Sequence, residues 1–104
     1  MQFINLTPHE IHEVITDTVI PSSGVARITV VSRQVDKISD IPIYQSKYEG
    51  QIEGLPEPKE GIIYIVSALC LNAIPEWRKD IVAPGNLVRD ESGNPVGCKG
   101  FRRK

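Results

Sequence analysis

The sequence predicts an α+β protein made mostly of short β-strands, in a small mixed or antiparallel sheet or a partly open barrel, with one short helix at about residues 67–74. Frequent turns are expected because the chain has eight glycines and eight prolines among 104 residues, which argues against a helical bundle. The apolar run at residues 62–66 is typical of a strand buried on both faces. Ser67 and Pro75 bracket the segment that follows, which has the composition of a helix. The length is that of one domain, residues 1–104.

The other elements follow from alternation and from turn residues. Pro8 ends the first strand, because it lacks a backbone donor and holds Thr7 in extended geometry. Pro42 predicts that its strand lies at an edge. Residues 49–61 are rich in glycine and proline and are expected to form one long loop, and residues 90–94 a hairpin turn. Strands are therefore expected at residues 2–6, 11–15, 19–20, 25–35, 41–48, 62–66, 86–89 and 95–101.

The charge balance excludes some classes of partner. Twelve basic and thirteen acidic residues leave a net charge of −1, so no overall basic field exists to hold a nucleic acid. No run of about 18 apolar residues is present, and the first residues lack the basic and apolar regions of a signal peptide. We therefore expect a cytoplasmic protein with neither a membrane nor a nucleic-acid partner.

The two cysteines are expected to be reduced thiols, as is usual in the cytosol. Cys70 lies among apolar residues of the predicted helix and is expected to be buried. Cys98 lies near the end of the chain and is expected to be accessible. Thiol counting on the native protein should then find at most one fast-reacting group.

The stretch Asn5-Leu6-Thr7-Pro8-His9 is the most distinctive in the chain. A histidine that follows a rigid turn can reach solvent, where it could carry a proton or contact a phosphate. The alternative is that Asn5 and Thr7 make the hydrogen bonds of the turn and His9 is merely exposed. The sequence favours the second interpretation, in which Asn5 and Thr7 form the turn and His9 is only exposed.

The junction between the buried strand and the helix is a second candidate site. A helix N-terminus offers free N–H groups to an anion, and Ser67 either contacts such a ligand or simply caps the helix. Arginines bind phosphate in a bidentate fashion, so Arg27, Arg78 and Arg89 matter if they converge. Scattered, solvated arginines are the ordinary alternative, and the basic end of the chain, Lys99 and residues 102–104, is ordinarily a solvated tail.

Signals of catalysis and of metal binding are missing from the sequence. There is no Gly-x-Ser-x-Gly motif, and the carboxylates of residues 49–61 lie in a stretch where nothing fixes a pair. His9 and His12 are three residues apart, which on a strand places them on opposite faces, and the chain has no Cys-x-x-Cys pair. We therefore expect no catalytic residue, no metal and no cofactor.

Several segments together resemble a family of small phage, prophage and bacterial proteins that open with Asn-Leu-Thr-Pro-His. They cover most of the chain: Asn5-Leu6-Thr7-Pro8-His9, Ile20-Pro21-Ser22-Ser23-Gly24, Gly54-Leu55-Pro56-Glu57-Pro58, Gly61-Ile62-Ile63-Tyr64-Ile65-Val66-Ser67-Ala68, Asp80-Ile81-Val82-Ala83-Pro84-Gly85 and Leu87-Val88-Arg89-Asp90. The resemblance implies the cytoplasm of a bacterial host cell and, by itself, no chemistry. In a phage setting, small non-catalytic proteins can sequester the nucleotide signals of bacterial immunity.

The preferred hypothesis is a small, non-catalytic, phage-type protein that binds a phosphate-bearing small molecule. In its more specific version the ligand is a nucleotide immune signal, and sequestering that signal is an anti-defence function. The aromatic residues Tyr44, Tyr64 and Trp77 are candidates for stacking on a base, and a homo-oligomer would help to build a pocket. One alternative is an interaction or inhibitor module that acts on a host or phage protein, and another is a small hydrolase that uses His9. The candidate ligand-binding residues are Thr7, His9, Arg27, Ser67, Arg78 and Arg89.

Overall fold

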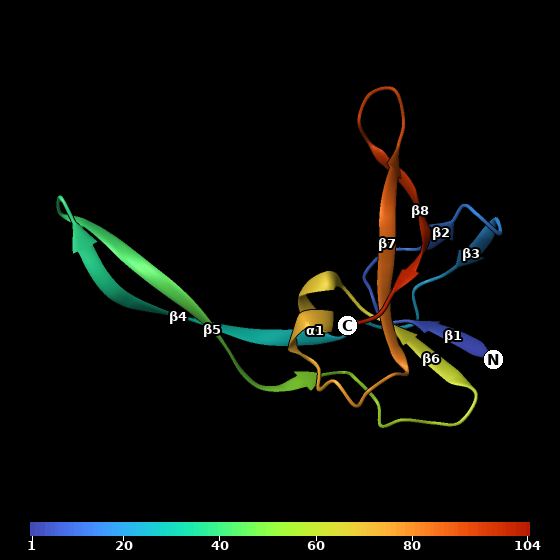
Figure 1. Ribbon diagram of the computed structural model, residues 1–104, viewed down its shortest axis with the longest axis horizontal. Helices are drawn as coiled ribbons and strands as arrows, with labels where there is room; N and C mark the ends of the chain where they lie inside the picture. The colour runs from blue at the N-terminus through green and yellow to red at the C-terminus, as the bar shows by residue number, and fades with distance from the viewer.

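The computed structural model describes the backbone of residues 1–104 and the side chains of all of these except residues 30 and 47–51. It has eight strands and one helix, in the order shown in Figure 1. Their bounds are β1 Gln2–Asn5, β2 Ile11–Glu13, β3 Thr18–Ile20, β4 Arg27–Ile38, β5 Ile41–Glu53, β6 Ile62–Ile65, α1 Ala68–Ala73, β7 Ile81–Arg89 and β8 Pro95–Arg102. The prediction of a chain made mostly of strands with one short helix is confirmed, although β4 and β5 are long, with 12 and 13 residues. No helix in this chain is long and apolar enough, over its described residues, to cross a membrane.

Six of the strands form a mixed sheet that nearly closes into a barrel, in the order β1-β6-β7-β8-β2-β3. Strands β1, β6 and β7 run parallel, β7 and β8 are antiparallel, β8 and β2 are parallel, and β2 and β3 are antiparallel. The two outer strands approach each other through Asn5, which forms an isolated bridge with Ser22 and accepts a backbone hydrogen bond from Ser23. The sheet is therefore curled so that its first and last strands almost meet.

Strand β6 is covered on both sides, as its apolar sequence predicts. Tyr64 and Val66 belong to one apolar cluster together with Leu71 and Ile74 of the α1 region, whereas Ile65 belongs to a second cluster inside the curled sheet. Successive side chains of a strand point to opposite faces, so a short strand buried on both faces must be apolar throughout. The expectation of a central strand is confirmed for Ile62–Ile65, which lies between β1 and β7.

Helix α1 begins and ends where the sequence indicates. Ser67 is its N-cap and accepts a hydrogen bond from the Cys70 backbone N–H at 3.3 Å. Ile74 is already extended, as expected for a residue before proline. The helix has six residues and buries Cys70 and Leu71 against the sheet.

Strands β7 and β5 are each several residues longer than expected. Strand β7 begins at Ile81 and contains Pro84, because the strand pairs with β6 at Ile81 and Val82 and with β8 from Ala83 onward. Strand β5 extends to Glu53, which pairs with Arg27, so the predicted loop of residues 49–61 is shortened to residues 54–61. Together, β4 and β5 form a separate two-stranded ribbon, in which Pro42 lies opposite Lys37. The edge position expected for the strand with Pro42 is confirmed.

Both cysteines are buried, each 2% exposed, so the expectation for Cys98 is wrong. Cys98 pairs with Leu87 in β8 and packs against Ile11, Ile65 and Val82 inside the curled sheet. Burial raises the pKa of its thiol. Nearness to the end of the chain does not imply exposure here, because the last strand is an interior member of the sheet order.

We therefore expect neither thiol to react rapidly with an aromatic disulfide reagent in the native protein. Reactive cysteines need an exposed thiolate, and here burial opposes both access and ionisation at Cys98. Absorbance after mixing should show no fast phase, and two thiols should appear on addition of guanidinium chloride. A rapid native phase of one thiol, abolished in Cys98→Ser, would contradict the burial of Cys98.

Candidate functional site

The stretch of residues 5–9 forms a buried polar turn. The Asn5 side chain is fully buried, and its Nδ2 donates to the carbonyl oxygens of His9 at 2.8 Å and Ile20 at 3.0 Å. Its Oδ1 accepts from the Thr7 backbone N–H at 2.9 Å and lies 2.6 Å from the Thr7 hydroxyl. The Ser22 hydroxyl donates to the Thr7 carbonyl oxygen at 2.6 Å. Asn5 and Thr7 thus build the turn and hold β1 to the end of β3.

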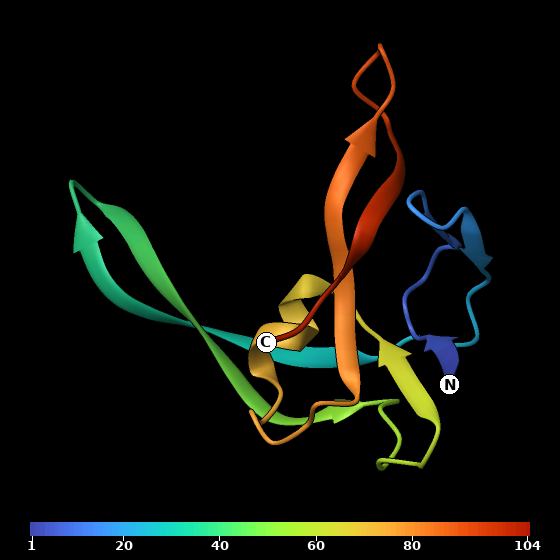
Figure 2. The ribbon, with the colours of Figure 1, turned by 45° about the vertical axis from the view of Figure 1, so that its right-hand side comes forward.

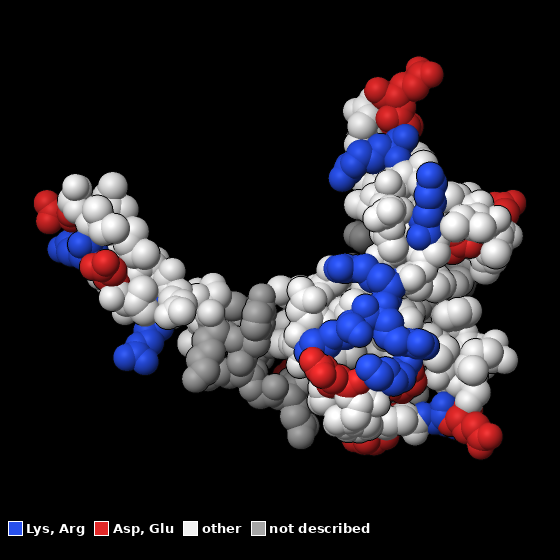
Figure 3. All heavy atoms as spheres, viewed as in Figure 1, with Lys and Arg blue, Asp and Glu red and all other residues white. Residues whose placement is uncertain are grey.

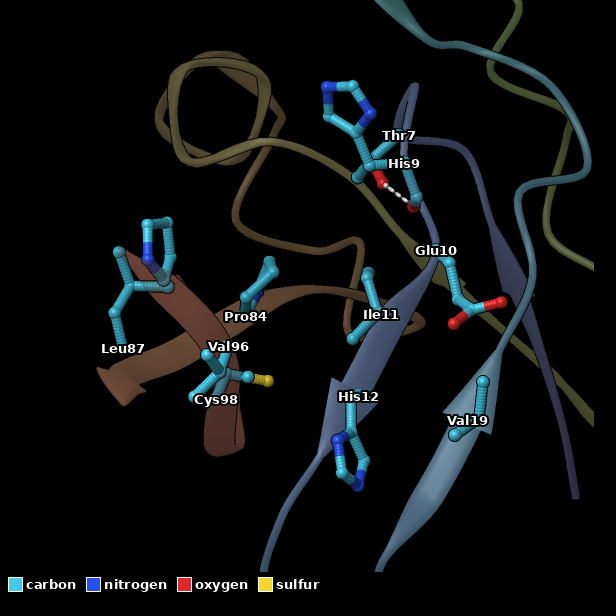
Figure 4. Close-up of a pocket in the computed structure, with 12 residues that line it drawn as sticks. Thr7, His9, Glu10, Ile11, His12, Val19, Pro84, Leu87, Val96 and Cys98 are labelled. Carbon is cyan, nitrogen blue, oxygen red and sulfur yellow. Dashed lines mark hydrogen bonds between the residues drawn. The ribbon is translucent and has the colours of Figure 1, made fainter. Parts of the chain in front are cut away.

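The turn presents His9 at one end of an apolar cavity of about 550 Å³, shown in Figure 4. The cavity lies between β2 on one side and the β7–β8 pair on the other, and Ile11 and the Cys98 sulfur point toward each other across it. The strands separate here because β2 and β8 pair only at Glu13 and Cys98. Its lining comprises Thr7, His9, Glu10, Ile11, His12, Val19, Pro84, Leu87, Pro95, Val96, Gly97 and Cys98.

The chemistry of this cavity suits an apolar group better than an anion. Its walls are aliphatic, and Val19, Leu87 and Val96 are about half exposed. Its ionisable side chains are His9, Glu10, His12 and Cys98, and no arginine or lysine occurs among the described residues that line it. His12 Nε2 lies 2.6 Å from Asp17 Oδ1, so this ring already has an acidic partner. Among the side chains described, no three His, Cys, Asp or Glu residues are placed to hold a metal ion.

Arg78 is engaged within the protein. Its Nε and Nη2 donate to the two carboxylate oxygens of Asp80 at 2.9 and 3.0 Å, and Nη2 also donates to the Pro56 carbonyl oxygen at 3.1 Å. This bidentate pair raises the pKa of Arg78 and lowers the pKa of Asp80. Only 8% of Arg78 is exposed, so the guanidinium fixes the loop before β6 to the start of β7.

The other predicted residues lie apart from the cavity. Ser67 serves as the cap of α1, and Arg27 is exposed at the start of β4, beside Ala26, whose carbonyl oxygen accepts from the Cys70 thiol at 3.5 Å. Arg89 ends β7 and donates to the Gly93 carbonyl oxygen at 2.9 Å in the β7–β8 turn. The structure therefore brings Thr7 and His9 together and leaves Arg27, Arg78 and Arg89 in three separate places.

A group of cationic residues that the sequence analysis treated as a solvated tail lies beside α1. Lys104 Nζ donates to the Ile74 carbonyl oxygen at 2.6 Å, which brings the end of the chain to the segment that follows α1. In that segment Trp77 is 66% exposed, and the guanidinium carbon of Arg78 lies 5.6 Å from the centre of its ring. We define the basic cluster as Lys79, Arg102, Arg103 and Lys104, all of them exposed.

Figure 3 shows lysine and arginine atoms gathered in a band over this part of the body, with acidic atoms along its lower side. The signal in the sequence was the Arg-Arg-Lys ending, but its contact with the segment after α1 depends on the path of β8 and could not be read from the sequence. Comparison of the chain with protein-family models, with curated proteins and with solved structures finds no match.

Proposed function

We propose that this protein binds a phosphate-bearing small molecule, without converting it, on the surface formed by Trp77 and the basic cluster. The observation that carries the proposal is the hydrogen bond from Lys104 Nζ to the Ile74 carbonyl oxygen, because it holds the basic end of the chain against the segment that contains the exposed Trp77 three residues later. A nucleotide has both groups that such a surface recognises, an aromatic base and at least one phosphate.

The two halves of the ligand would use different interactions. The base stacks on the indole of Trp77, whose other neighbour, Arg78, is held in place by Asp80. Stacking of a base on an aromatic side chain contributes about 1–3 kcal/mol, and each charge-assisted contact about 1.5–3 kcal/mol. One stacked base and two phosphate contacts therefore support a dissociation constant in the micromolar range, on the order of 10 μM.

In the cell, we propose that the protein sequesters a nucleotide signal. The resemblance of residues 5–9 and of the later segments to small phage and bacterial proteins favours a nucleotide used in bacterial immunity. A protein that acts by sequestration needs affinity and no chemistry, so the bound nucleotide should be recovered unchanged.

Titration calorimetry with a panel of mono-, di- and cyclic nucleotides tests the proposal. We expect at least one nucleotide to bind, with at least tenfold weaker binding in Trp77→Ala and in Arg103→Gln. Both side chains are exposed, so the melting temperature of each variant should match that of the wild type. Chromatography of the recovered ligand should show an unaltered nucleotide.

Arg89→Gln is the matched control, because Arg89 is also exposed but lies in the β7–β8 turn. Its affinity should equal that of the wild type. If Arg89→Gln loses binding and Trp77→Ala does not, the site lies elsewhere. Silence of the wild type across the whole panel would contradict the proposal and favour an interaction module, whereas conversion of the nucleotide would favour a hydrolase, with His9 as the first residue to replace.

A further inference from the structure

The ribbon of β4 and β5 projects from the body of the protein as an arm. Among the described side chains of the ribbon, Ile28 and Ile52 at its base contact the apolar cluster under α1. From residue 31 to residue 46 every residue is exposed, and Figures 1 and 2 show this part extending alone. The radius of gyration is 16.5 Å, compared with about 13 Å for a compact chain of this length. We use the word arm for residues 31–46.

One face of the arm is an apolar stripe. Residues directly opposite each other in an antiparallel pair share a face, and the register pairs Ile38 with Ile41 and Asp36 with Ile43. Side chains alternate along β5, so Gln45 lies on the same face as Ile43. Gln45 pairs with Arg33, and the bulge between Gln34 and Asp36 places Arg33 on this face as well. Among the residues whose side chains are described, the face therefore carries Val31, Arg33, Asp36, Ile38, Ile41, Ile43 and Gln45, and position 47 lies opposite Val31.

The four aliphatic residues of the stripe are exposed in the single chain. Val31 and Ile43 are 40% and 37% exposed, and Ile38 and Ile41 are 59% and 63% exposed. An isolated two-stranded ribbon is only marginally stable in water, and contiguous apolar patches on a monomer ordinarily mark an interaction site. The tip is a tight two-residue turn in which Ser39 and Asp40 both have positive φ, which fixes the register of the stripe.

We propose that the stripe is covered by the same stripe of a second copy of this chain, with the two arms antiparallel about a twofold axis. The order of residues along β4 supports this arrangement. Read outward, the face presents Val31, then Arg33, then Asp36, then Ile38. In an antiparallel pair, Val31 of each copy meets Ile38 of the other, and Arg33 of each copy meets Asp36 of the other.

This order is self-complementary in both polarity and charge, which is what a twofold interface requires. A parallel alignment about a twofold axis along the arm would instead place β4 of each copy over β5 of the other, so that Arg33 meets Gln45 and Asp36 meets Ile43 without any charge pair. The other face of the arm, which carries Lys37, Pro42 and Tyr44, lacks this pattern. The second copy is therefore the occupant that the residues of the stripe specify.

The size of the stripe is that of a weak interface. Residues 31–38 span about 25 Å along β4, and a ribbon face of that length offers on the order of 500 Å² per copy. A total of about 1,000 Å² is at the lower limit for a specific interface. We therefore expect a dimer that dissociates in the micromolar range, and a concentration of about 100 μM should populate it.

Sedimentation equilibrium of the full chain at about 100 μM tests the apolar contact. The wild type should have twice the 11.6 kDa chain mass, and the triple variant Ile38→Thr, Ile41→Thr, Ile43→Thr should be monomeric. Threonine keeps the β-branched shape that suits a strand, so the arm itself is retained. Tyr44→Thr removes an equally exposed side chain from the opposite face and should remain dimeric.

A charge exchange tests the alignment independently of apolar content. Arg33→Asp places like charges opposite each other in a homodimer, and so does Asp36→Arg, so each variant alone should dissociate more readily. An equal mixture of the two variants should form a heterodimer, because each introduced charge then faces an opposite one. Either of two sedimentation results would overturn the proposal: a monomeric wild type, or the same mass for the triple variant and Tyr44→Thr. The proposal would also be overturned if the mixture of Arg33→Asp and Asp36→Arg were no more dimeric than each variant alone.

Discussion

Replacing Asn5 by leucine is expected to lower the free energy of unfolding by about 4 kcal/mol, the largest effect of any single substitution discussed for this protein. Leucine has nearly the shape of asparagine but neither donates nor accepts. The Thr7 backbone N–H and the Ile20 carbonyl oxygen would lose a buried partner, and the His9 carbonyl oxygen would keep only the Thr7 hydroxyl. Each unsatisfied buried group costs about 1–3 kcal/mol, and the gain in apolar burial offsets only part of this.

Urea denaturation at pH 7 measures this effect. The control is Asn72→Leu, which makes the same chemical change at an exposed position of α1 and should alter stability by less than about 0.5 kcal/mol. If the free energy of unfolding of Asn5→Leu lies within about 1 kcal/mol of the wild-type value, the polar turn does not hold β1 to β3. The partial closure of the sheet would then need another explanation.

Glu13→Gln is expected to lower the melting temperature at pH 7 by on the order of 10 °C. The Glu13 carboxylate is buried and accepts four hydrogen bonds of 2.6–2.8 Å. The donors are the backbone N–H groups of Ile15, Thr16 and Gly100 and the Thr16 hydroxyl. Glutamine has one acceptor oxygen, and its amide N–H₂ would face a donor, so at least one backbone group loses its partner.

The same contacts make the effect depend on pH. Hydrogen bonds from Thr16, Gly100 and Ile15 lower the Glu13 pKa from 4.5 to about 2. Because the folded-state pKa is depressed, the stabilisation is complete above about pH 4.5 and is lost as the pH falls toward 2. The difference in melting temperature between wild type and Glu13→Gln should therefore shrink between pH 5 and pH 2.

Calorimetric melting across this pH range checks the prediction. Glu10→Gln is the control, since Glu10 is exposed and makes none of these contacts, and its difference from the wild type should stay small at every pH. A constant difference for Glu13→Gln from pH 7 to pH 2 would show that its carboxylate does not contribute through its charge.

The sequence predicts the parts of this fold that depend on local patterns. Residues 62–66 and Ser67 with Pro75 identify the central strand and the helix, because burial on both faces and helix capping leave a signature in adjacent residues. The burial of Cys98 leaves no such signature in the adjacent residues. It arises because β8 lies between β7 and β2, and this strand order is a property of the whole sheet.

The candidate site was predictable only in part, for the same reason. The Asn-Leu-Thr-Pro-His stretch identifies a turn, but the sequence cannot show that Asn5 and Thr7 use their side chains in the turn while His9 faces a cavity. Arg78 carries a guanidinium suited to phosphate, yet Asp80, two residues away, engages it. The basic end of the chain has an ordinary composition, and only the contact between Lys104 and Ile74, near Trp77 in the chain, indicates a candidate binding surface.

The indole N–H signal of Trp77 in a ¹H–¹⁵N spectrum tests the proposed binding surface most directly, because Trp77 is the single tryptophan of the chain and gives a single indole signal. Each nucleotide of the panel would be added in turn to the labelled full-length protein. We predict that at least one shifts this signal in a saturable way, together with the backbone signals of residues 102–104, and leaves those of Arg89 and Gly93 unchanged. An indole signal that stays in place with every nucleotide would contradict the account.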